Sequence, residues 1–117
     1  MIHTKLYPTL FATAVLLAAC TQQTPEERAA AMLRDARYAM HHHLWNEARD
    51  TILSLRRNCP TAIEARRQAI LLLDSIEMNA AADSLRIVTG EEWKRLNMKK
   101  QFFERKLQED QKKQKTP

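Results

Sequence analysis

NEARDTIL, residues 46–53, is the stretch that decides the fold of this 117-residue chain. It aligns with NAAADSLR at residues 79–86, an offset of 33 residues, and Ala36 aligns with Ala69 at the same offset. The matched pairs are Asn46/Asn79, Ala48/Ala81, Asp50/Asp83, Thr51/Ser84 and Ile52/Leu85. A sequence repeat of about this length, with helical residue patterns, is typical of stacked helix-turn-helix units. The chain is therefore predicted to be all-α.

Capping boxes, in which a Thr is followed three residues later by a Glu, predict where the helices begin. They occur at residues 24–27, 61–64 and 89–92. In such a box the Thr hydroxyl accepts from the backbone N–H of the Glu, and the Glu side chain reaches back to the Thr. The helix expected from the second box has a broad apolar side over residues 62–76, which suits a helix packed between neighbours.

The residues around the first repeat unit resemble the tetratricopeptide repeat, a family of helical hairpins. The two small positions of that pattern are occupied by Ala36 and Ala48, and the aromatic position by Trp45. Ile52 occupies the bulky position, and Pro60 is the closing proline. The sequence departs from the pattern at Met32 and Ala39, and His43 stands where a glycine normally makes the turn. The resemblance covers residues 25–88, with a weaker second unit. It implies helical hairpins that serve as a protein-binding scaffold.

The first twenty residues resemble the signal of bacterial lipoproteins. One basic residue, Lys5, precedes an uncharged apolar run at residues 6–19, which is too short to cross a bilayer as a helix. The run ends in LAAC at residues 17–20, which resembles the lipobox. The resemblance implies that residues 1–19 are removed and that Cys20 receives a diacylglycerol and a further acyl chain such as palmitate. Two such signals anchor a protein stably to a membrane.

The residue after the lipobox cysteine is Thr21, not the aspartate that retains some lipoproteins in the inner membrane. The resemblance therefore implies an outer-membrane lipoprotein facing the periplasm, with residues 20–24 as a short tether. Cys59 would be the remaining thiol, which excludes an intramolecular disulfide in the mature chain. We interpret Cys59 as a packing residue at a helix end.

Three consecutive histidines, His41 to His43, raise the alternative of a metal site. A helix from Pro25 to Asn58 would be unusually long, so a break is expected near these histidines. Successive helical residues point about 100° apart, so three adjacent rings cannot converge on one ion. Histidine near a helix C-terminus also interacts favourably with the helix dipole. We therefore expect no metal ligands, and keep a small metal-binding envelope protein using His41–His43 as the alternative function.

Residues 89–117 form a separate, basic region. Residues 20–90 contain nine basic and nine acidic residues, whereas residues 91–117 contain nine basic and five acidic residues. From Glu91 to about Gln114 the sequence predicts one long charged helix with a narrow apolar stripe, made by Trp93, Leu96, Phe103 and Leu107.

This basic amphipathic tail has two interpretations. It could fold back and cover the open end of the hairpins, as solenoid ends require. It could instead be an arm that docks on an envelope protein or an anionic surface, which we favour because Phe102 and the lysine excess are not explained by capping. The candidate partner-binding residues are Trp93, Phe102, Phe103, Lys99 and Lys100.

The sequence shows no catalytic pattern. One glycine leaves no phosphate-binding loop, and no serine lies in a nucleophile-elbow pattern. Glu26, Glu27, Asp50 and Asp83 are interpreted as capping or solvated charges. We expect neither an enzyme nor a cofactor, small-molecule substrate or nucleic acid partner. The predicted function is that of a membrane-anchored adaptor or scaffold, attached through lipidated Cys20.

Overall fold

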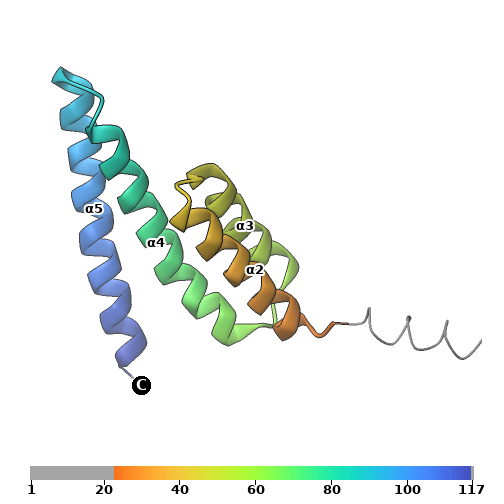
Figure 1. The fold of residues 1–117 in the computed structure, drawn as a ribbon. Coiled ribbons are helices and arrows are strands. Elements are labelled where there is room, and N and C mark those ends of the chain that lie inside the picture. The colour runs from red at the N-terminus through yellow and green to blue at the C-terminus, as the bar shows by residue number, and fades with distance from the viewer. Residues whose placement is uncertain (1–22, 117) are drawn as a thin grey trace, which may run out of the picture.

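The computed structural model describes residues 23–116, and within that range the chain is all-α (Figure 1). The helices are α2 (Pro25–His41), α3 (Trp45–Asn58), α4 (Ile63–Leu85) and α5 (Gly90–Lys115). Each runs antiparallel to the one before it (Figure 1). The predicted fold class is confirmed. The predicted signal peptide, the lipobox and Cys20 lie outside the described residues.

Two of the three predicted helix starts coincide with threonine caps. The Thr24 hydroxyl accepts from the backbone N–H of Glu27 at 3.1 Å, as predicted. Thr89 is the N-cap of α5, although its side chain makes no capping hydrogen bond. The box at Thr61 was predicted wrongly, because α4 has Ala62 at its N-cap. Ala62 is buried in the core, and this packing fixes the start of α4.

The break between α2 and α3 lies at the histidines, as the sequence predicts. The backbone N–H of Leu44 donates to the Ala39 carbonyl at 2.9 Å, and that of His43 donates to the Met40 carbonyl at 3.0 Å. This is the Schellman pattern, which needs a left-handed residue after the helix. His43 is that residue, with φ of 59°, at the position where the repeat family has glycine.

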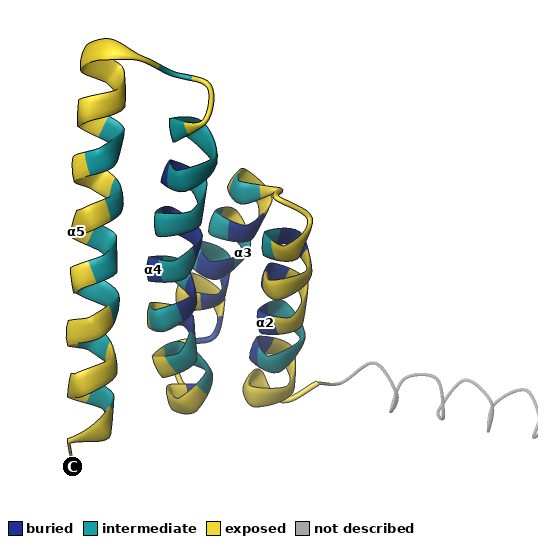
Figure 2. Cartoon of the chain, turned by 60° about the vertical axis from the view of Figure 1, so that its left-hand side comes forward, coloured by how far each residue is buried: buried dark blue, intermediate teal, exposed yellow. Residues whose placement is uncertain are grey.

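The core lies between α2, α3 and the first part of α4 (Figure 2). Its closest contacts are made by alanines, since Ala36, Ala48 and Ala69 are fully buried. The larger buried side chains include Ile52, Leu55 and Ile76. Small residues at these positions let the helix backbones approach closely. Cys59, a free thiol at the C-cap of α3, is also buried, as expected for a helix-end packing residue.

The second repeat unit does not form its own hairpin within residues 61–88. Such a unit would need a turn before Asn79, but α4 continues without a break to Leu85. The Asn79 side chain donates to the Ser75 carbonyl at 2.8 Å, one turn earlier in the same helix. No Gly or Pro interrupts this segment. The hairpin partner of α4 is therefore α5.

The C-terminal helix α5 packs along α4. Within the described chain, the backbone of α5 does not come close to the backbone of α2 or α3. Figure 1 shows α4 as the central helix, with the α2–α3 hairpin on one side and α5 on the other. None of the four described helices combines the length and apolar character needed to cross a bilayer.

Candidate interaction surface on the C-terminal helix

The predicted stripe on α5 is the side that faces α4. Leu96, Phe103 and Leu107 are half-buried there. The opposite side is exposed along its length, as Figure 2 shows. It presents Met98 and Phe102, which are 69% and 52% exposed. The helix therefore covers α4 with one side and leaves apolar side chains on the other.

A buried carboxylate fixes α5 to α4. Asp74 of α4 is 2% exposed, and its Oδ1 accepts from Lys106 Nζ at 3.0 Å. The same ammonium donates to Asp110 Oδ2 at 2.8 Å. Burial, followed by the neighbouring Asp110 carboxyl, raises the pKa of Asp74 to about 6, although Lys106 acts in the opposite direction. Asp74 Oδ2 has no hydrogen-bond partner among the described residues.

A second buried carboxylate joins three helices. Glu77 of α4 is 8% exposed and accepts a hydrogen bond from Arg49 Nε of α3. Its other oxygen lies 3.5 Å from Lys99 Nζ of α5. Removing α3 or α5 would leave the buried Glu77 carboxylate with only one of these two cationic partners. Lys99, predicted as a partner-binding residue, is thus a structural ion-pair partner.

A third acidic residue of α4 fixes the turn between α2 and α3. Asp83 Oδ2 accepts from Trp45 Nε1 at 2.9 Å and lies 2.7 Å from His43 Nδ1. The hydrogen bond with His43 is the main cause that lowers the pKa of Asp83. The interpretation of Asp83 as a solvated charge is therefore wrong. The side chain aligns the strained turn with the end of α4.

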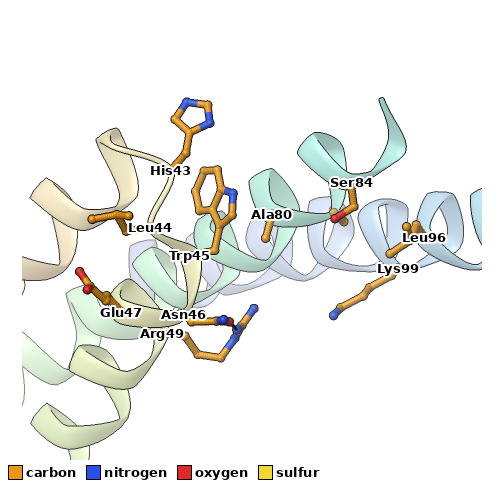
Figure 3. A pocket seen from close by; sticks show the side chains of 11 residues that line it. His43, Leu44, Trp45, Asn46, Glu47, Arg49, Ala80, Ser84, Leu96 and Lys99 are labelled. Atoms are coloured by element: carbon orange, nitrogen blue, oxygen red, sulfur yellow. Dashed lines mark hydrogen bonds between the residues drawn. The ribbon is translucent and has the colours of Figure 1, made fainter. Parts of the chain in front are cut away.

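A pocket lies beside Trp45, where the start of α3 faces α4 and α5 (Figure 3). Its volume is about 470 Å³. The two cationic residues that line it are Arg49 and Lys99. Both pair with the single carboxylate of Glu77, and the lining also contains the acid Glu47. The two cations at the pocket are therefore matched in number by two carboxylates.

The remaining exposed surface of α5 is centred on Phe102. Phe102 packs edge-on against Phe103, with ring centroids 5.1 Å apart. A shallow groove of about 240 Å³ runs beside it, lined also by Arg105, Lys106 and Glu109. We call Met98, Phe102, Arg105 and Glu109 the outer face of α5.

The five predicted partner-binding residues do not form one surface. Phe102 lies on the outer face, whereas Phe103 and Lys99 are directed to the body. Lys100 pairs with Glu104 of its own helix at 3.4 Å, and Trp93 is 42% exposed near the start of α5. The tail is not an arm separate from the body, which corrects the favoured interpretation.

The sequence did not reveal that Asp74 and Glu77 are buried, or that Lys106 pairs with Asp74. A signal was present, because both acids lie next to the apolar positions Leu73 and Ile76 of the middle helix. A charge on a helix side that packs against neighbours requires a partner. The sequence does not tell which of the many lysines and arginines supplies it.

The histidines at the turn make separate interactions. The His42 ring lies on Tyr38, with centroids 4.2 Å apart, and His43 pairs with Asp83. Across residues 23–116 no three His, Cys, Asp or Glu side chains are grouped in a way that could hold a metal ion. The geometry therefore offers no observation in favour of the metal-binding alternative.

Comparison of the chain with protein families, with curated proteins and with solved structures finds no match.

Proposed function

We propose that this chain is a lipid-anchored adaptor of the bacterial cell envelope, which binds a protein partner through the outer face of α5. The lipobox resemblance at residues 17–20 supports anchoring through Cys20. The α2–α3 hairpin, with buried Ala36 and Ala48 and a left-handed turn residue, supports the proposal that it is of tetratricopeptide type.

One observation carries the proposal of a partner surface. The pairs Lys106–Asp74 and Lys99–Glu77 hold α5 against the body, and yet Met98 and Phe102 remain exposed. A rigid, exposed aromatic beside a methionine is the kind of residue set that anchors protein interfaces. Because the helix is already packed, little conformational entropy would be lost when a partner binds.

The groove beside Phe102 indicates the chemistry of the partner. Arg105 offers a guanidinium next to the aromatic ring, and it forms no ion pair among the described residues. The surface fits a segment that presents an apolar side chain next to a carboxylate.

The anchor is tested by metabolic labelling with a palmitate analogue. Cys20→Ser should abolish labelling and membrane retention, since the other thiol is buried at the end of α3. Cys59→Ser is the matched control and should be labelled like the unmodified chain. Full labelling of the Cys20→Ser chain would refute the lipid anchor.

The partner surface is tested by affinity capture of the tagged lipoprotein from solubilised envelopes. Phe102→Ser should remove the co-purifying partner without loss of α5 packing, because Phe102 faces outward. Tyr38→Ser is the control, since Tyr38 is an exposed aromatic on α2, 65% accessible. Equal capture by both variants would argue against the outer face as the binding site.

A further inference from the structure

One end of the helical bundle is strongly basic. It consists of the start of α2, the end of α3, the start of α4 and the end of α5, which lie at the same end in Figures 1 and 2. The basic residues within four positions of these helix ends are Arg28, Arg56, Arg57, Arg66, Arg67, Lys112, Lys113 and Lys115. We call this set the basic end; its acidic residues are Glu26, Glu27 and Glu64.

Hydrogen bonds connect the helices at the basic end. Arg66 Nη1 of α4 donates to the Arg56 carbonyl of α3 at 2.7 Å. Arg67 Nη2 donates to the Gln114 carbonyl of α5 at 3.0 Å, and the Gln114 side chain returns a bond to the Arg67 carbonyl at 2.7 Å. The cationic groups of three helices are thereby gathered on one surface.

The opposite end of the bundle carries no such excess. Within four residues of its helix ends and in its loops there are four basic residues, Arg37, Arg49, Arg86 and Lys94, and four acidic residues, Glu47, Asp83, Glu91 and Glu92. The excess of basic over acidic residues is thus concentrated at one end of the bundle and is not spread evenly along the helices.

The basic end is also the end from which the chain leaves toward the anchor. Cys20 lies four residues before Thr24, the N-cap of α2. A fully extended chain covers at most about 3.6 Å per residue, so Cys20 lies within about 14 Å of Thr24. If Cys20 carries the lipid, the basic end is held at the membrane surface.

An apolar side chain lies among these cations. Ile63 is the first residue of α4 and is 67% exposed, close to Arg66 and Arg67 in the chain. Apolar side chains flanked by basic residues enter the headgroup boundary of anionic membranes. Positive charge near such a surface is attracted within about one Debye length.

We propose that the basic end is a membrane-docking surface that holds the anchored body upright on anionic phospholipid headgroups, with Ile63 inserted at the boundary. This proposal rests on the proposed lipid anchor. Docking in this orientation leaves the length of α5, and with it the outer face, directed away from the lipid. Attraction to anionic headgroups explains why the lysines at the end of α5 and the arginines of α3 and α4 meet at one end.

Tryptophan quenching by brominated lipids tests the orientation. The native tryptophans Trp45 and Trp93 lie near the opposite end, so the lipidated chain itself should be quenched weakly. In vesicles containing about one third phosphatidylglycerol, Ile63→Trp should add a strongly quenched signal. Ile87→Trp is the matched control, since Ile87 is 86% exposed in the loop between α4 and α5. Equal quenching of Ile63→Trp and Ile87→Trp would overturn the proposal.

The electrostatic part is tested with the same reporter. The Ile63→Trp quenching should fall severalfold in vesicles of phosphatidylcholine alone, and in about 1 M salt, where the Debye length is about 3 Å. It should fall similarly when Arg56, Arg57, Lys112 and Lys113, all exposed, are changed to Gln. The control removes the same number of exposed cations elsewhere, at Arg34, Arg86, Lys94 and Arg95, and should leave quenching unchanged. Quenching that is independent of lipid charge would refute docking to anionic headgroups.

Vesicle flotation separates this proposal from the anchor on which it rests. A chain that does not float with phosphatidylcholine vesicles lacks the anchor, and both proposals fall. A chain that floats, but whose Ile63→Trp reporter is not quenched in anionic vesicles, is anchored without docking, and only the basic-end proposal falls.

Discussion

Asp74 is a buried residue whose charge responds to pH in the mildly acidic range. Its pKa is raised from 3.8 to about 6 by burial. Between about pH 4 and pH 6 the folded state therefore holds a proton that the unfolded state has lost, so the contribution of Asp74 to stability falls as pH rises. The free energy of unfolding of Asp74→Asn, relative to the unmodified chain, should increase from pH 4 to pH 7. Urea unfolding across this range measures it.

The control for that experiment is Asp50→Asn, because Asp50 is an exposed aspartate on α3. The increase in the free energy of unfolding from pH 4 to pH 7, relative to the unmodified chain, should be larger for Asp74→Asn than for this variant. An Asp74→Asn curve that runs parallel to that of the unmodified chain would show that the buried carboxyl does not titrate in this window.

His43 is a second residue with a specific structural role. Its φ of 59° is strained for any residue with a Cβ, and its ring is bonded to Asp83. Both His43→Gly and His43→Ala lose the hydrogen bond, but Gly alone relieves the strain. The Gly variant should be more stable than the Ala variant by about 1 kcal/mol in chemical unfolding. Equal stability would contradict the left-handed turn.

Single residues were predictable only where they act locally. The Thr24 cap follows from its neighbouring residues, whereas the helix break at the histidines is expected from the excessive length of an unbroken helix; both are present. The pairing of Asp74 with Lys106 spans 32 residues and depends on how α5 packs on α4. Such contacts follow from tertiary packing, which the order of residues within one helix does not specify.

At the scale of elements, the close helix contacts should depend on alanines. Ala48 and Ala81 are 0% and 3% exposed. Replacing either with Leu should overpack the interface and cost about 1–3 kcal/mol of unfolding free energy. Ala82→Leu, at a half-buried neighbour of Ala81, is the control and should cost less. Unchanged thermal unfolding of both core variants would contradict the packing.

The C-terminal helix should contribute strongly to stability. Lys106→Ala leaves the buried Asp74 carboxylate without its cation. Because the pKa of Asp74 is already about 6, the carboxyl can take up a proton instead, so the loss near pH 7 should be about 1–2 kcal/mol. Lys112→Ala, at an exposed position of the same helix, is the control. A thermal midpoint unchanged by Lys106→Ala would indicate that α5 is an independent arm.

The helices themselves were largely predictable, and their partners were not. The long C-terminal helix and the first hairpin follow from periodicity and caps. The length of α4 did not, because the 33-residue similarity between residues 46–53 and 79–86 suggested a second hairpin. The same residue types serve in both places, but residues 79–86 continue an existing helix whereas residues 46–53 follow a turn.

At the scale of the whole molecule, the described chain has two surfaces that the core does not use. The basic end lies at the start of α2, where the predicted tether arrives, and the outer face lies along the side of α5 (Figure 1). One surface would orient the protein on the membrane, and the other would remain accessible to a partner. The central claim is that the outer face of α5 binds an envelope protein.

Site-specific photo-crosslinking in intact cells tests that claim most directly. A photoreactive phenylalanine analogue at Phe102 should give a discrete adduct with one envelope protein, and Arg105→Glu in the same chain should abolish it. The analogue at Tyr38, a more exposed aromatic site on α2, should give no such adduct. Absence of an adduct at Phe102, or the same adduct from both positions, would contradict the account.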